Sequence, residues 1–174
     1  MLNYVLLISR QGELGWVFTE SDNPCVVSGK VRLAKWYKTM PSKAKARIVQ
    51  DVTTRVLARR PRMCNVLEYK DTRLIYRRYA SLFFVCAIDP TDNELITLEV
   101  LHRYVEILDR YFSNVTELDL IFNFQKAYAV LDELVLAGEM QESSRSNTLR
   151  CVQGAEAFEA NEVLTQVLKE SSLV

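Results

Sequence analysis

The stretch Cys64–Ile88, CNVLEYKDTRLIYRRYASLFFVCAI, contains three strand-like runs in direct succession. The runs are CNVLEY (64–69), RLIYRRY (73–79) and SLFFVCAI (81–88), and Lys70-Asp71 between the first two favours a turn. Strands joined by such short turns pair antiparallel. The third run is almost continuously apolar, which is typical of a strand covered on both faces. The stretch therefore predicts one side of an antiparallel sheet, with its last strand in the interior.

Two further strands are predicted toward the N-terminus. The run LNYVLLIS (2–9) is apolar enough to be buried, and KVRLAKWY (30–37) alternates. The alternation predicts two faces for the second run: Val31, Leu33 and Lys35 on one, and Arg32, Ala34 and Trp36 on the other. The sheet would then have five strands.

A helix is predicted between the second and third strands. It begins at Pro41-Ser42 and stops before Pro61, which cannot continue a helix. Its apolar stripe repeats every four residues: Ala44, Ile48, Val52 and Val56. The many basic residues of this helix lie mostly off the stripe.

More helices are predicted after the sheet. Thr91 and Glu94 have the spacing of a capping box, in which each side chain satisfies the other residue's backbone N–H. One apolar face follows: Leu95, Leu98, Leu101, Val105, Leu108 and Phe112. A second helical stretch, 114–136, is broken near residues 122–124 and ended by Gly138. A polar tail follows from Glu139. The predicted fold class is α+β, with a five-stranded antiparallel sheet flanked by helices on both faces.

Composition gives little support to an enzyme. The 174 residues fit one domain, and a formal net charge of zero argues against a nucleic-acid binder. The four cysteines form no C-x-x-C pair, the only histidine is His102, and five glycines leave no room for a phosphate-binding loop. We therefore expect no catalytic group, metal or cofactor. The longest apolar run, Leu82–Ile88, is far shorter than the roughly 20 residues that span a bilayer.

Four long motifs resemble the small (σ) subunit of clathrin adaptor complexes: VRLAKWY (31–37), YRRYASLFF (76–84), DNELITLEVLHRYVEILDRYF (92–112) and ELDLIFNFQKAYAVLDEL (117–134). The resemblance covers nearly the whole chain except residues 13–29 and the tail after about Glu142. Within the family, RMCNVLEYKD, YASLFF and DNELITLE are most similar to the trans-Golgi and endosomal adaptor, adaptor protein complex one. The plasma-membrane adaptor is the runner-up.

The resemblance implies a longin-like domain over residues 1–142, with a polar helical tail over 143–174. It also implies a non-catalytic subunit of a heterotetramer with two large subunits and one medium subunit. Such a protein would be cytoplasmic, held peripherally at the trans-Golgi network, endosomes and clathrin-coated vesicles through its complex, and would meet clathrin only indirectly. It would help bind acidic dileucine sorting signals, [D/E]-x-x-x-L-[L/I], in the cytosolic tails of cargo.

The signal-binding residues follow from the resemblance, position by position. Arg32 would face the acidic residue of the signal. The leucine pocket would be formed by Ala80, Leu82, Val105, Asn114, Val115 and Leu120, with Asn114 also contacting the peptide backbone. Thr116 stands where the family usually has a cysteine. From the residues alone, the five apolar members of this set would be assigned to the core.

Residues 13–29 separate Gly12 from Lys30, whereas the family runs from SRQGK directly into VRLAKWY. We expect an insertion in the first hairpin, since closure entropy grows slowly with loop length. It is either a natural regulatory loop or, the hypothesis we favour, a retained in-frame intron.

Three other functions stay open. One is a small subunit of another coat, such as the ζ chain of coatomer. Another is a membrane-surface module whose basic first helix binds anionic lipid. The third is a site for an acidic peptide or a phosphate, made if the basic strands 30–37 and 73–79 meet.

Overall fold

The computed structural model describes residues 1–10, 29–60 and 62–171. Five strands form one sheet in the order β2-β1-β5-β4-β3, and every neighbouring pair is antiparallel. The strands are β1 (Leu2–Arg10), β2 (Gly29–Trp36), β3 (Val66–Tyr69), β4 (Thr72–Tyr79) and β5 (Leu82–Ile88). The helices are α1 (Ser42–Leu57), α2 (Glu94–Phe112), α3 (Glu117–Phe122), α4 (Phe124–Leu134) and α5 (Arg145–Ser171). The predicted α+β fold is confirmed.

The sheet has helices on both faces, which explains why β5 is buried along its whole length. Tyr4, Leu6 and Ile8 of β1 belong to a core with α1 residues Val52 and Val56. The alternate β1 residues belong to a second core shared with α2 and α4. Because β1 supplies both cores, its apolar run is continuous.

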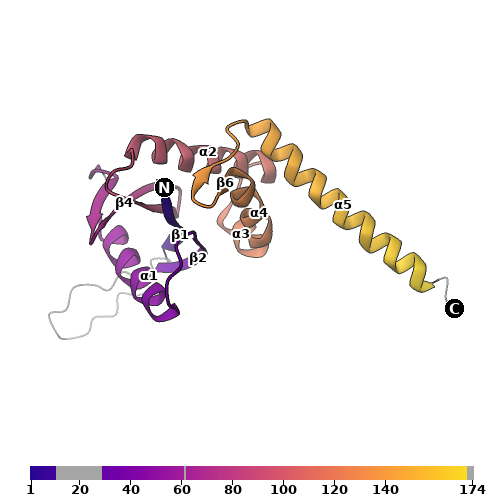
Figure 1. Cartoon of the computed structure of the whole chain (residues 1–174), viewed down its shortest axis with the longest axis horizontal. Helices are drawn as coiled ribbons and strands as arrows, with labels where there is room; N and C mark the ends of the chain where they lie inside the picture. The colour runs from indigo at the N-terminus through magenta and orange to yellow at the C-terminus, as the bar shows by residue number, and fades with distance from the viewer. Residues whose placement is uncertain (11–28, 61, 172–174) are drawn as a thin grey trace.

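α5 begins against α2 and α4 and then extends away from the rest of the chain (Figure 1). Val152 is buried among the residues of the second core. Farther along, Glu156 accepts a hydrogen bond from the Tyr111 hydroxyl and pairs with Lys126 at 2.6 Å. Within the described residues, no helix is long and apolar enough to cross a membrane.

The expected start of α2 was wrong by two residues. The N-cap is Asn93, whose side chain accepts a hydrogen bond from the Leu95 backbone N–H, and not Thr91. The helix therefore begins at Glu94, and Leu95, predicted on the buried face, is 73% exposed in the first turn.

The expected role of Gly138 was also wrong. α4 ends at Leu134, and Gly138 lies between β6 (Val135–Leu136) and β7 (Glu139–Met140), a short antiparallel hairpin. Its φ of +88° suits glycine, and its carbonyl accepts a hydrogen bond from the Leu2 N–H. A Cβ there would lie 2.5 Å from the carbonyl oxygen of Leu2.

The predicted alternation of β2 holds from Leu33 to Trp36 but is wrong at the start of the strand, for Val31 and Arg32. Val31 packs in the same core as Ala34 and Trp36, on the α1 face, whereas Leu33 belongs to the opposite core. The cause is an irregularity at Arg32, described below. In addition, β2 and β4 are separated by β1 and β5, so the two basic strands do not meet.

Candidate functional site

Arg32 occupies a β-bulge. Leu7 pairs with Leu33 and Ile8 pairs with Val31. In this register no residue of β1 lies opposite Arg32. A bulge inserts one extra residue into a strand and re-aims the side chains around it. This irregularity turns Val31 toward α1 and leaves Arg32 free to reach a different element.

Arg32 reaches α3, where its Nη2 lies 3.1 Å from Oε1 of Glu117. Its Nε donates a hydrogen bond of 2.9 Å to the Ser9 hydroxyl. The other oxygen of Glu117 accepts a bond of 2.9 Å from Ser81, in the turn between β4 and β5. The side chains of Arg32 and Glu117 are 17% and 26% exposed, so the pair is partly shielded from water.

The network lowers the pKa of Glu117. Burial by itself raises this pKa, but hydrogen bonds from Ser81, Ser9 and Arg32 and the charge of Arg32 together outweigh it. Glu117 is therefore a carboxylate at neutral pH. It is paired with the guanidinium of Arg32, which is predicted from the sequence to face the acidic residue of a sorting signal.

Four of the five apolar candidates share the core on the α2 side of the sheet, whereas the assignment of Ala80 to the core was wrong, because Ala80 is exposed. Leu82 and Leu120 are 6% and 1% exposed and belong to one buried cluster. Val105 of α2 and Val115, just before α3, are half-buried and pack against the same cluster. The residues predicted to form a leucine pocket are thus packed together, and a ligand side chain could enter only by displacing some of these contacts.

Asn114 and Ala80 are exposed and have left-handed backbones, with φ of 81° and 51°. Asn114 follows Ser113, the αL cap of α2, and its N–H donates to the Asp109 carbonyl at 3.1 Å. The next N–H, of Val115, donates to the Asp109 carboxylate at 3.1 Å. Asp109 therefore fixes the path of the chain from α2 to α3, which sequence reasoning did not foresee.

The residue that replaces the usual cysteine has a local role. Thr116 is the N-cap of α3 and forms a capping box with Asp119, whose carboxylate accepts from the Thr116 N–H at 2.9 Å. This box has Asp at the position usually taken by Glu or Gln. It fixes the start of α3 and, one residue later, the position of Glu117.

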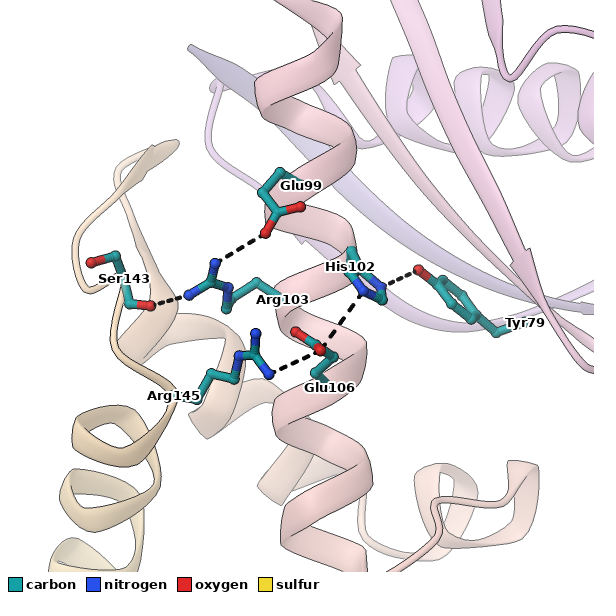
Figure 2. Close-up of polar contacts among 7 residues, drawn as sticks. All are labelled: Tyr79, Glu99, His102, Arg103, Glu106, Ser143 and Arg145. Carbon is teal, nitrogen blue, oxygen red and sulfur yellow. Dashed lines mark hydrogen bonds and ion pairs between the residues drawn. The ribbon is translucent and has the colours of Figure 1, made fainter.

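The only histidine belongs to a polar cluster on α2 (Figure 2). His102 Nδ1 lies 2.9 Å from the Tyr79 hydroxyl, and its Nε2 lies 3.7 Å from Glu106. Arg145, at the start of α5, pairs with the same Glu106 oxygen at 3.0 Å. The cluster joins β4, α2 and α5, which gives His102 a structural role. In the described part of the chain, no group of three His, Cys, Asp or Glu residues could hold a metal ion.

The profile of the family described as clathrin adaptor complex small chain matches residues 26–159, well over half of the chain. The chain belongs to this family. A member of the clathrin adaptor small chain family is a small subunit of an adaptor complex in clathrin-coated vesicle trafficking, a structural component and not a known enzyme.

Individual relatives agree with the family. The chain is 53% identical over 156 residues to the AP-1 complex subunit sigma-1 of Schizosaccharomyces pombe, which covers 90% of this chain and 86% of the relative. It is 44% identical over 174 residues to the AP-1 complex subunit sigma-1A of Homo sapiens, covering 99% of both chains. Among solved structures, it resembles a chain in a homology model of the full-length AP-3 complex, with a TM-score of 0.65 and 25% identity. That likeness covers 94% of this adaptor small chain and 98% of the other chain.

Proposed function

We propose that this small chain works in an AP-1-type adaptor that carries cargo between the trans-Golgi network and endosomes. The support is the run of AP-1 sigma subunits among its relatives, at 41–53% identity over most of the chain. Its partners would be two large subunits and one medium subunit. It would reach membranes peripherally, through that complex, and clathrin indirectly.

Identification of the chains that co-purify with it from its own cells tests this assignment. Large and medium subunits of adaptor protein complex one are expected. Subunits of the plasma-membrane adaptor or of coatomer would favour the alternatives, and a stable monomer would contradict all three.

The second part of the proposal is that the chain helps bind acidic dileucine signals. It rests on one observation: the bulge at Arg32 presents a guanidinium to α3, and α3 also carries Leu120 of the adjoining apolar cluster. A signal needs a cation for its acidic residue and an apolar site for its leucines, and three residues of the signal separate the two.

The expected affinity is modest. Burial of a leucine side chain contributes roughly 1.5–3 kcal/mol. A partly exposed charge pair adds up to about 1 kcal/mol. Binding should therefore be micromolar in scale and reversible, with avidity supplied by many adaptors on one coat.

Capture of a dileucine peptide by the assembled complex tests the site. Arg32→Ser and Leu120→Ser should each weaken capture. Matched controls are Arg110→Ser, an exposed arginine on α2, and Leu118→Ser, a leucine on α3 that is 62% exposed. Capture that is unchanged in both test variants would contradict the site assignment.

We also propose that residues 13–29 are an insertion into a hairpin of the domain spanning 1–142, with 143–174 as a tail. Most of this insertion lies outside the described residues. Two observations support the insertion hypothesis: β1 and β2 still pair as far as Arg10 and Gly29, and the family match begins only at residue 26. Gly29 packs closely on α1: a Cβ there would come 2.4 Å from a methyl group of Leu57, so a larger residue would require that side chain to shift. Removal of 13–29 would place Gly12 at that position.

A further inference from the structure

Charge is strongly segregated in this neutral chain. Residues 30–62 hold 11 of its 22 Lys and Arg residues but only one of its 22 Asp and Glu residues, Asp51. That segment has a formal charge of +10, and the rest of the chain has −10. The segment comprises most of β2, α1 and the residues that follow α1.

Most of these cations form no ion pair inside the described structure, although Arg59 donates hydrogen bonds to the Tyr76 hydroxyl and the Cys64 carbonyl. Of its ion pairs, only Arg32–Glu117 and Lys35–Asp132 involve residues 30–62, and both arise from β2. Asp51 accepts a hydrogen bond of 2.9 Å from the Tyr69 hydroxyl. The cations of α1 therefore have no carboxylate partner among the described residues.

Helix stability does not explain the cations at the beginning of α1. Its first turn contains no acidic residue, its N-cap Pro41 makes no side-chain hydrogen bond, and Lys43, Lys45 and Arg47 lie in the first two turns. Positive charge at a helix N-terminus is unfavourable because it opposes the helix dipole. These residues weaken the helix that carries them, so an external partner gives a reason for their presence.

The outward side of α1 carries its cations spread over a long surface, which suits a broad ligand. Lys43, Arg47 and Arg55 are exposed on the side of α1 that points away from the sheet, and they span about 18 Å of helix. Arg55 lies over the ring of Tyr69 at 5.3 Å, which holds its charge at the surface. After the helix, Met63 is 47% exposed among several arginines. Spread cations beside an exposed apolar side chain match an anionic membrane surface better than the single acidic residue of a peptide.

We propose that the outward face of α1 and the segment that follows it bind anionic lipid headgroups, so that this subunit touches the membrane directly. The proposal goes beyond signal binding and does not depend on it. The basic face of α1 faces away from α2, α4 and α5, because these helices cover the other side of the sheet.

Co-sedimentation of the full chain with vesicles tests the proposal. One set of vesicles contains phosphatidylcholine and phosphatidylserine, and the other contains phosphatidylcholine alone. The test variant is Lys43→Gln/Arg47→Gln, and the matched control is Arg110→Gln/Arg150→Gln, which removes the same charge from exposed positions on α2 and α5. Thermal melts followed by circular dichroism check that both variants fold.

We expect binding to phosphatidylserine vesicles that weakens as salt is raised, and little binding to phosphatidylcholine alone. The affinity of the test variant for phosphatidylserine vesicles should fall about tenfold or more, since each Lys or Arg near the surface contributes a factor of roughly five to that affinity. The affinity of the control variant should fall far less. Equal binding to both vesicles, or equal losses in both variants, would overturn the proposal. So would binding of soluble polyglutamate through Lys43 and Arg47 without vesicle binding, because that result assigns the face to an acidic protein.

Discussion

Glu117→Gln should strengthen the capture of acidic dileucine peptides. In the free protein, the Glu117 carboxylate holds the guanidinium of Arg32 at 3.1 Å, so it competes with the acidic residue of an incoming signal. Glutamine has the same shape and keeps an oxygen for the Ser81 hydroxyl, but it removes the competing charge. The substitution should therefore make Arg32 more available while keeping it in place through Ser9.

The size of the effect follows from the exposure of the pair. Arg32 and Glu117 are 17% and 26% exposed, so their attraction lies near the upper end for surface pairs, about 1 kcal/mol. Its loss converts to about a fivefold gain in affinity for an acidic peptide. The same change should lower the free energy of unfolding by about 1 kcal/mol, because the folded state loses the ion pair.

Fluorescence anisotropy with the assembled complex measures the gain. Two labelled peptides are compared, one with glutamate and one with glutamine at the acidic position of the signal. Glu117→Gln should tighten the binding of the glutamate peptide and leave the binding of the glutamine peptide nearly unchanged. An equal change for both peptides, or weaker binding of the glutamate peptide by a folded variant, would refute the idea that Glu117 competes with the signal.

Three further results are expected. Leu120→Ser should lower the free energy of unfolding by about 3–4 kcal/mol, since Leu120 is 1% exposed, while exposed Leu118→Ser should change it by less than about 1 kcal/mol in chemical denaturation. Deletion of residues 13–29 should keep the fold and stabilise it by about 1–2 kcal/mol through a shorter hairpin loop, and an unfolded product would contradict the insertion hypothesis. Because the folded pKa of Glu117 is lowered from 4.5, its stabilising effect is present above that value and is lost as the pH falls through the folded pKa. Melts of the wild type and Glu117→Gln should therefore differ at neutral pH and converge in acid.

The regular parts of the fold were predictable because each follows one repeating pattern. Val52 and Val56 fall on the predicted stripe of α1 and are fully buried. The helical stretch after α2 is broken at Asn123, as its sequence indicated, into α3 and α4. The three runs of 64–88 became β3, β4 and β5 because short turns leave antiparallel pairing as the only option.

Features set by tertiary contacts were not predictable. Thr91 and Asn93 are both good N-cap residues, and only the path of the chain out of β5 decides that Asn93 caps α2. Gly138 comes directly after a stretch with a helical pattern, but glycine is needed there because the β6–β7 hairpin approaches Leu2 closely. The bulge at Arg32 depends on the register with β1, and no alternation within β2 reveals it. The segregation of charge, by contrast, is visible in the sequence as soon as acidic and basic residues are counted by segment.

The candidate site divides into two parts that differ in backbone geometry. Its apolar residues, Leu82 and Leu120, belong to the core, so substitutions there change stability and binding together. Three other positions lie on irregular backbone: Arg32 on a bulge, and Ala80 and Asn114 in the left-handed region. Such conformations persist only where surrounding structure holds them, and they gather at functional sites. The core thus serves as the support that fixes the irregular positions, and Arg32 and Asn114 are the positions where binding can be altered with the least effect on folding.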